Sequence, residues 1–249
     1  MARHKLSDEH WSKLRTIMRE QGIYDKCNLR KTVEGILYRM RVGCPWRDLP
    51  RRFGRWNSVF QKFNRWSSQG KLMRVFKALV QEPDLEWGFI DGSIVKAHQH
   101  SAGAASEEHQ AIGKSVGGNT TKIHMAVDSH GLPIDFDITG GEVHDCKIAP
   151  EFIEKLPVAD FTIADKGYES EEVREVIRKK SSVPVIPRKS NSKTGNADMD
   201  WGLYKYRHLV ENLFARIKHF RGLATRFDKL KRNYVSVVAM ACARLWLPM

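Results

Sequence analysis

The spacing of apolar residues changes about a third of the way along the chain, and this change constrains the fold more than any other feature. In the first part, apolar side chains recur at helical spacing in four short runs, as Trp11, Leu14 and Ile17 do. In the second part, short apolar runs end at polar turns, as in strands. The sequence therefore predicts an all-helical segment over residues 1–80 and an α/β segment over residues 81–249.

The helical segment carries many arginines among its short helices, which resembles a helix-turn-helix module. Charge concentrates between Arg47 and Arg55, beside Trp46 and Trp56. These tryptophans are either core residues or platforms for base stacking, and a core role is favoured. We expect this segment to be a small DNA-binding domain.

The predicted elements of the α/β segment alternate between strands and helices. We expect a strand that ends at Asp91, a β-hairpin, a buried strand that ends at Asp165, and a proline-containing edge strand. The strand ranges are Leu85–Ile90, Thr121–Val127, Leu132–Thr139, Phe161–Ala164 and Val183–Pro187, and helices are expected over Ala149–Leu156, Glu171–Lys180 and from Tyr204. This order predicts an α/β fold with a ribonuclease-H-like mixed sheet flanked by helices.

Charged residues are distributed unevenly along the chain. Residues 1–80 carry 19 Lys and Arg against 6 Asp and Glu, residues 81–201 carry 13 against 21, and residues 202–249 carry 10 against 2. Basic ends suit a polyanion and an acidic middle suits metal ions. A solvated surface with a basic excess is the alternative explanation.

Asp91 and Asp165 each follow an apolar run directly. Side chains at the carboxyl ends of neighbouring strands point into a common crevice, where α/β sheets hold their ligands. Two neighbouring carboxylates repel each other, and a shared divalent cation removes that penalty. Because Asp-Gly and Asp-x-Gly are also common turn formers, two unrelated turns are the alternative.

The helix expected from Tyr204 places four functional groups on one face. Arg207, Glu211 and Lys218 follow at offsets that, at about 100° per residue, keep all four side chains within about 60° of one another. An aromatic ring, a guanidinium, a carboxylate and an ammonium therefore share this face. A solvated salt-bridge stripe is the alternative, and Arg207 with Glu211 alone would fit it.

The spacing Y-x2-R-x3-E-x6-K on this helix resembles that of bacterial insertion-sequence transposases with a DDE catalytic triad. Other motifs are similar to those of the insertion-sequence-five group: G-C-P-W-R-D-L-P at Gly43–Pro50, D-G-S at Asp91–Ser93, T-T-K-I-H at Thr120–His124 and A-D-K-G-Y at Ala164–Tyr168. The resemblance covers nearly the whole chain. One departure is that only residues 188–202 precede the last helix, too few for the large insertion of some relatives.

This resemblance implies that Asp91, Asp165 and Glu211 hold two Mg²⁺ ions, which Mn²⁺ can replace, for DNA cleavage and strand transfer. Arg207 and Lys218 would bind phosphates near the scissile bond. Basic residues of the helical segment would recognise terminal inverted repeats. The further candidates for DNA contact are Tyr204, for which packing is an equal alternative, and Arg47, Arg51, Arg52, Arg55, Lys62 and Arg65.

The implied partners are double-stranded DNA, as inverted repeats and target, and further copies of the chain in a homodimer or higher oligomer. We expect a cytoplasmic, nucleoid-associated location in bacteria. The sequence lacks a signal peptide pattern and a long apolar stretch, and its four scattered cysteines fit a reducing compartment. A nuclease that cuts without joining and a non-catalytic DNA-binding protein are the alternative functions.

Of the six histidines between the two aspartates, five are considered as possible metal ligands, namely His98, His100, His109, His124 and His144. An H-x-H pair in a polar loop is weak evidence for zinc without a second pair, so polar loop roles are preferred. His144 and Asp145 are further candidates for the rim of the active site.

Overall fold

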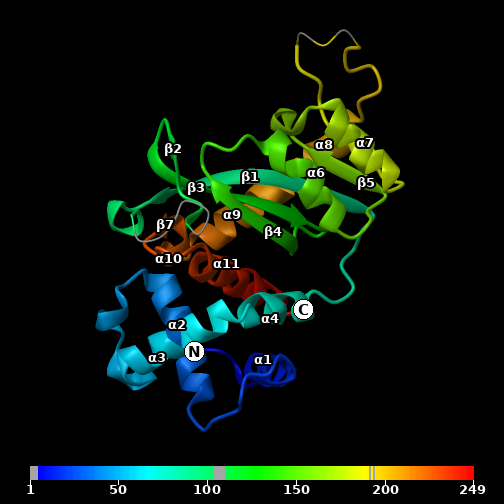
Figure 1. The fold of residues 1–249 in the computed structure, drawn as a ribbon. Coiled ribbons are helices and arrows are strands. Elements are labelled where there is room, and N and C mark those ends of the chain that lie inside the picture. The colour runs from blue at the N-terminus through cyan, green and yellow to red at the C-terminus, as the bar shows by residue number, and fades with distance from the viewer. Residues whose placement is uncertain (1–4, 104–109, 191, 193) are drawn as a thin grey trace. The chain divides into compact units, whose positions relative to one another are not determined.

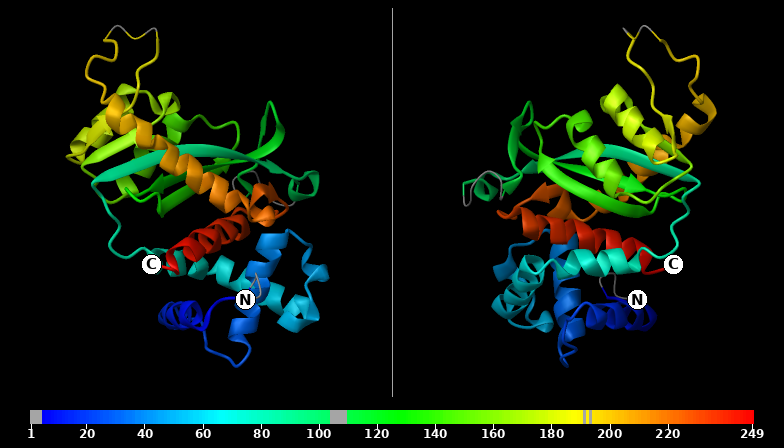
Figure 2. Two further views of the ribbon diagram at one scale, coloured as in Figure 1. Left: turned by 180° about the vertical axis from the view of Figure 1, so that it is seen from behind. Right: turned by 45° about the vertical axis from the view of Figure 1, so that its right-hand side comes forward.

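The computed structural model describes residues 5–103, 110–190, 192 and 194–249. The chain divides into two compact units, whose elements are labelled in Figure 1 and seen from two further sides in Figure 2. Unit 1 comprises Met1–Gln81, Val95–Ala111 and Ile217–Met249, and unit 2 comprises Glu82–Ile94 and Ile112–Arg216. Each unit therefore contains segments that are distant in the sequence.

The four helices expected in the first 80 residues are present in unit 1. They are α1 (Asp8–Glu20), α2 (Leu29–Val42), α3 (Trp56–Ser68) and α4 (Lys71–Leu79), with short 3-10 turns at Trp46–Asp48 and Arg51–Phe53. Ser7 caps α1 by accepting a hydrogen bond from the His10 backbone N–H at 3.1 Å. Gly43 ends α2 in the left-handed conformation, at φ 74°.

Two C-terminal helices, α10 (Arg221–Ala224) and α11 (Lys231–Trp246), also belong to unit 1. α11 packs against α3 and α4, and α10 packs against α2. The expected boundary after residue 80 is therefore not the boundary between the compact units. The physical reason is that α11 is apolar on nearly every side, so it needs neighbours around its whole circumference.

The sheet of unit 2 has the expected mixed arrangement. Its strands are β1 (Trp87–Ala97), β2 (Gly113–Ser115), β3 (Gly118–Val127), β4 (Pro133–Gly140), β5 (Phe161–Ala164) and β6 (Val183–Val185). The order is β2-β3-β1-β5-β6, and β4 pairs with β3 as the predicted antiparallel hairpin. β5 runs parallel to β1 and β6 parallel to β5, which leaves the proline-containing β6 at the edge. The last residues of β1 pair with β7 (Thr225–Arg226) inside unit 1.

Helices cover both faces of this sheet (Figures 1 and 2). α6 (Asp145–Lys155) and α7 (Glu171–Lys179) lie on one face, and α8 (Trp201–Tyr204) with α9 (His208–Lys218) on the other. Ile90, Phe152 and Ile177 belong to the buried core between the sheet and the first pair. α6 begins four residues before the expected Ala149, since Asp145 in its first turn is favourable to the helix dipole.

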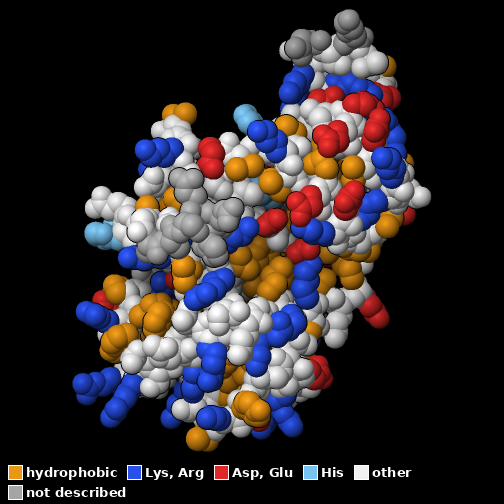
Figure 3. Space-filling model, viewed as in Figure 1, with side chains coloured by type: hydrophobic (Ala, Val, Ile, Leu, Met, Phe, Trp, Pro, Cys, Tyr) orange, Lys and Arg blue, Asp and Glu red, His pale blue; other side chains and the backbone are white. Residues whose placement is uncertain are grey.

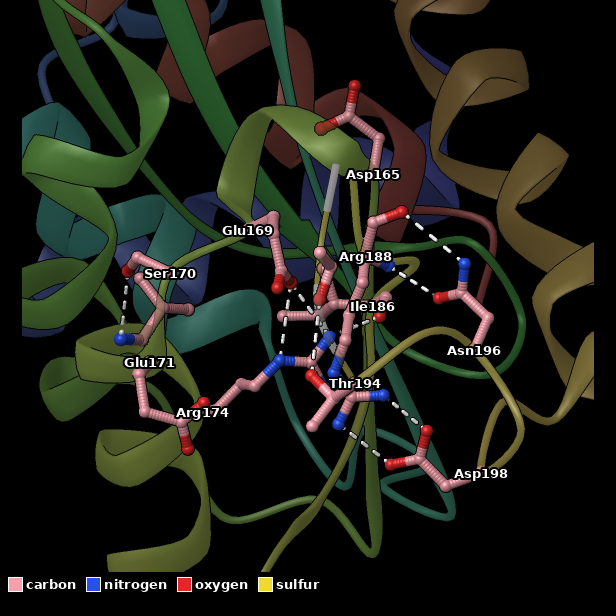
Figure 4. A network of polar contacts seen from close by, with 12 residues as sticks. Asp165, Glu169, Ser170, Glu171, Arg174, Ile186, Arg188, Thr194, Asn196 and Asp198 are labelled. Carbon is pink, nitrogen blue, oxygen red and sulfur yellow. Dashed lines mark hydrogen bonds and ion pairs between the residues drawn. The ribbon is translucent and has the colours of Figure 1, made fainter. Parts of the chain in front are cut away.

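A polar network involves residues that follow β6 and residues that precede α8 (Figure 4). The buried Arg174 of α7 donates to Glu169 at 2.7 Å and to the Ile186 carbonyl at 2.5 Å. Farther along, Arg188 forms an ion pair with Asp198. The polar linker thus has defined contacts at both its ends. Among the described helices, none has the length and apolar character that crossing a bilayer requires.

Candidate active site

The parallel pairing of β1 and β5 brings Asp91 and Asp165 to neighbouring positions. Ile90 pairs with Ala164 in this ladder, so the aspartate that follows each of them lies at the same level of adjacent strands. Each carboxylate also accepts a hydrogen bond of 2.8 Å from a backbone N–H that follows it closely in the chain. The strand register therefore places the two carboxylates side by side.

The strand expected to end at Asp91 continues past it to Ala97. Asp-Gly-Ser favours a turn in a short peptide, but β1 is an inner strand whose ladders hold these residues extended. Asp165 does follow the end of β5, and it caps the 3-10 turn η4 (Lys166–Tyr168). The prediction of a strand end was wrong for the first aspartate and right for the second.

One α-helix was expected from Tyr204. The structure instead has three elements there, which are the end of α8, the 3-10 turn η5 (Lys205–Arg207) and α9. Short 3-10 turns of this kind are common at helix termini. Arg207, at the end of η5, donates to Asp91 Oδ2 at 3.1 Å and also to Glu211 Oε1. One guanidinium therefore links a carboxylate of the sheet to a carboxylate of α9.

The pKa of Asp91 is raised to about 6, chiefly by burial and also by the negative charges of Asp165 and Glu211. The backbone N–H of Gly92 and the Arg207 guanidinium act in the opposite direction without cancelling this effect. Burial alone lowers the pKa of Arg207, but the charges of Asp91 and Glu211 outweigh it, so that pKa is raised. Such a surplus of carboxylate charge favours the binding of a cation.

Within the described ranges, no group of three or more His, Cys, Asp or Glu side chains is arranged to hold a metal ion. The chemistry of the residues nevertheless fits one, because carboxylate oxygens are the ligands that Mg²⁺ and Mn²⁺ prefer. Arg207 already acts as one positive partner for Asp91 and Glu211 together. The Glu211 side chain is 52% exposed, which leaves it free to reorient towards a cation.

A second cluster of polar side chains lies beside Gly92. Of its members, only Asp145 was expected from the sequence to line the site, at its rim. An ideal Cβ at Gly92 would lie 2.6 Å from Asp145 Oδ1 and 3.3 Å from the Tyr168 hydroxyl. Lys122 Nζ lies 3.2 Å and His124 Nδ1 3.4 Å from the same Asp145 oxygen. The buried Tyr168 hydroxyl has no hydrogen-bond partner in the described part of the chain.

The sequence carried a signal for these residues. Lys122 and His124 belong to the T-T-K-I-H motif, and Tyr168 to A-D-K-G-Y. Motif membership alone, however, does not reveal that the side chains meet, because β3, α6 and η4 come together only in the folded unit.

The other two residues of the helix pattern lie on either side of Glu211. The Tyr204 ring centre is 5.9 Å from the Arg207 guanidinium and contacts Trp201 edge-on. Lys218 is the last residue of α9, about 10 Å along the axis from Glu211 at about 1.5 Å per residue.

The histidines do not form a common site among the described residues. His98 precedes the 3-10 turn Gln99–Ser101, and its ring stacks on Phe227 at 4.5 Å. His144 is the N-cap residue of α6. His109 lies outside the described residues.

The N-terminal cations expected to contact DNA are accessible in unit 1. Five are exposed and Lys62 is half-buried; the exposed ones are Arg47, Arg51, Arg52, Arg55 and Arg65. In Figure 3, most of the charged side chains visible over the helices of this unit are Lys or Arg. Trp46 packs against Phe63 at 5.2 Å, as a core residue does. Trp56 is 36% exposed, and the Arg47 guanidinium lies 5.8 Å from its ring.

Two known families match this chain. Residues 83–246 match the family described as "Transposase DDE domain", and residues 6–76 match "Putative transposase of IS4/5 family".

Several curated proteins are similar to it. The "Putative transposase for insertion sequence element IS6501" of Brucella ovis is 34% identical over 132 residues, covering 51% of this chain and 98% of the relative. The "Transposase for insertion sequence element IS1106" of Neisseria meningitidis serogroup B is 24% identical over 219 residues, covering 75% and 76%.

One similar solved structure is a piggyBac transposase synaptic complex with hairpin DNA. It aligns with a TM-score of 0.55 and 10% identity, over 97% of this chain and 72% of that chain. At this level of identity the likeness concerns the fold.

Proposed function

The chain belongs to the family of DDE transposases, and from this premise we propose that it cleaves the ends of an insertion sequence and joins them to target DNA. Cleavage would expose 3′-hydroxyl groups, which then attack a phosphodiester of the target. The proposal is supported by the register of β1 and β5, which places Asp91 beside Asp165, and by Arg207, which bonds both Asp91 and Glu211.

The three carboxylates Asp91, Asp165 and Glu211 would hold two Mg²⁺ ions, or Mn²⁺ in their place. When bound, such ions activate water or a 3′-hydroxyl for attack and stabilise the leaving oxygen. Asp91 takes part in its ionised form, so its raised pKa predicts weaker ion binding below about pH 6.

The basic side chains of the same face would bind and orient the DNA strand. Arg207 would exchange its carboxylate partners for oxygens of the scissile phosphate, which a guanidinium binds in a bidentate manner. The Tyr204 ring would hold the guanidinium by the cation–π contact already present. Lys218 would contact a phosphate farther along the strand.

Recognition of the terminal inverted repeats would belong to the helical part of unit 1, through the exposed arginines from Arg47 to Arg55, while Lys62 and Arg65 would contact the same DNA. Residues 1–80 would then recognise the DNA ends, and residues 81–249 would carry out catalysis. Because both ends of an element must be brought together, we expect a homodimer or higher oligomer on DNA.

The test is strand cleavage on double-stranded DNA that carries the gene's own flanks, with Mg²⁺ or Mn²⁺. We expect the wild type to cut at defined ends and Glu211→Gln to lose at least a hundredfold in rate, because the variant keeps the shape but not the charge of a ligand. Glu175→Gln, which changes an exposed carboxylate of α7, is the matched control and should cut normally.

The outcomes separate the proposal from its alternatives. Cutting followed by covalent joining to a second duplex supports a transposase, whereas cutting without joining under all conditions identifies a nuclease. Specific binding with no cutting by the wild type identifies a DNA-binding protein. Equal cutting by the wild type and Glu211→Gln would contradict the assignment of the triad.

A further inference from the structure

A basic pocket lies in unit 1, away from the three carboxylates in sequence and built by different elements. It encloses about 330 Å³, at the lower end of the volumes typical of ligand sites, about 300–1,000 Å³. The segment between α1 and α2, one face of α3 and the start of α4 form its walls. Its lining residues are Gly22, Tyr24, Lys26, Leu29, Lys62, Arg65, Trp66, Gln69 and Lys71.

Four of these residues are cations, and none is acidic. Lys62 Nζ donates to the neutral oxygens Asn28 Oδ1 at 3.0 Å and Thr32 Oγ1 at 3.2 Å. Lys71 Nζ donates to the Gly22 carbonyl at 2.5 Å. The bonds recorded for these two ammonium groups therefore orient them without neutralising them.

The cations of the pocket act on one another. Burial lowers the pKa of Lys62, and the like charges of Lys26 and Arg65 lower it further. The adjacent carboxylate Asp25 is engaged elsewhere, since Arg15 donates to it at 2.7 Å. An anion in the pocket would relieve this repulsion.

The rim adds a second kind of surface. Tyr24 is 85% exposed, which is unusual for a large aromatic side chain, while Trp66 and Leu29 form a buried apolar base. An exposed ring beside several cations is a combination with which proteins hold nucleic-acid strands without regard to sequence, because the cations bind phosphates and the ring packs on an adjoining nucleotide.

We propose that this pocket binds two consecutive phosphate groups of one DNA strand, with the Tyr24 ring against the adjoining sugar. The proposal rests on the proposed function, because DNA is the substrate assigned there. The pocket would position any duplex through its backbone, whereas reading of the base sequence is left to the exposed arginines between Arg47 and Arg55.

The first experiment measures DNA affinity of the full chain as a function of salt, for a duplex with the gene's own flank and an unrelated duplex of equal length. We expect Lys26→Gln/Arg65→Gln to weaken both complexes about tenfold or more, and to lower the slope of log affinity against log salt by about 2, one for each phosphate contact. Lys5→Gln/Lys31→Gln removes the same charge from exposed positions outside the pocket and should lower the slope less.

Tyr24→Ala separates the two parts of the proposal. Loss of the ring's contact with the strand should weaken binding about fivefold without changing the salt slope, because no charge is removed. An unchanged affinity would show that Tyr24 does not contact the DNA and would overturn that part of the proposal.

The second experiment is lysine acetylation of the wild type read by mass spectrometry, with and without DNA. Duplex DNA should protect Lys26, Lys62 and Lys71 and leave Lys31 reactive. Protection by inorganic phosphate or pyrophosphate with no protection by DNA would make the pocket a site for free phosphate and overturn the proposal.

The two hypotheses fail in different ways. Specific cleavage by a wild type whose pocket lysines stay reactive on DNA, with equal salt slopes for the pocket and control variants, contradicts the pocket and leaves the transposase function standing. Absence of any DNA binding by the wild type contradicts both.

Discussion

At the scale of the residue, the ionisation of Asp91 links the active site to stability. Its pKa is raised from 3.8 to about 6, so the folded chain holds a proton on this carboxyl at pH values where the unfolded chain has released it. By linkage, the free energy of unfolding falls as the pH rises from about 4 to about 6, and the loss is complete above that range. The ionised site is therefore a source of instability in the absence of a cation.

We predict that Asp91→Asn stabilises the metal-free protein at neutral pH by about 1–3 kcal/mol, and much less at pH 4, because asparagine carries no charge to bury. Urea unfolding in the presence of a chelator at both pH values measures this difference. Glu175→Gln is the control for a general loss of negative charge. An equal effect of Asp91→Asn at pH 4 and pH 7 would show that ionisation of this carboxyl is not the cause.

The small size of Gly92 is a second residue-scale requirement. Since a Cβ at this position would lie 2.6 Å from Asp145 Oδ1, Gly92→Ala should displace the carboxylate from its ion pair with Lys122. We predict a loss of about 1–3 kcal/mol in unfolding free energy, as overpacking gives, together with slower DNA cleavage. In Gly117→Ala the nearest atoms lie at 3.6 Å and 3.8 Å, so this control should be nearly neutral in both assays.

The residues of the site could be predicted from the sequence to different degrees. The positions of Asp91 and Asp165 after apolar runs, and the i to i+4 spacing of Arg207 and Glu211, are local patterns that survive folding. That Arg207 also reaches Asp91, 116 residues earlier, is a long-range contact that no local pattern contains. The surroundings of Asp145 escaped prediction for the same reason.

At the scale of the element, α7 shows how burial changes the importance of an ion pair. Arg174 and Glu169 are 3% and 15% exposed, and Arg174 also bonds the Ile186 carbonyl after β6. On the same helix, Arg178 and Glu171 form a pair that is 48% and 66% exposed. Of these two pairs, only that of Arg174 and Glu169 links α7 to residues outside the helix.

We predict that Arg174→Met destabilises the protein by about 3–5 kcal/mol, because it leaves a mostly buried carboxylate and a carbonyl without their donor. Arg178→Met should cost less than about 1 kcal/mol, as exposed ion pairs do. Chemical unfolding monitored by circular dichroism compares the two variants. Similar losses for both would mean that α7 is held by its apolar face alone.

Elements with a strong pattern were predicted well, and those that depend on neighbours were not. The helices from α1 to α4 and the β3–β4 hairpin follow from apolar periodicity and turn residues. β1 was predicted too short because its second half is polar and is held extended by the strands beside it. The helix from Tyr204 contains a 3-10 turn that periodicity does not distinguish from an α-helix.

At the scale of the whole molecule, the two compact units do not follow the order of the chain. Sequence patterns divide the chain after residue 80, where helices give way to strands. The structure instead groups α10 and α11 with the N-terminal helices. A sequence shows which side chains are apolar, but it does not show which helices pack their apolar faces against one another.

This grouping bears on whether residues 1–80, the expected DNA-binding domain, can fold by themselves. Leu72, Val75 and Phe76 on α4 are fully buried in the intact chain, and α11 packs against that helix. We predict that residues 1–80 alone expose this apolar surface and unfold without a cooperative transition, because each buried side chain of this size contributes about 1.5–3 kcal/mol. Thermal unfolding by circular dichroism and gel-shift assays on the gene's flanks test this. A chain in which a Gly/Ser linker joins residue 81 to residue 217 restores α11 and should recover a cooperative transition. If residues 1–80 alone melt cooperatively and bind the ends as the full chain does, α11 is dispensable for the recognition domain.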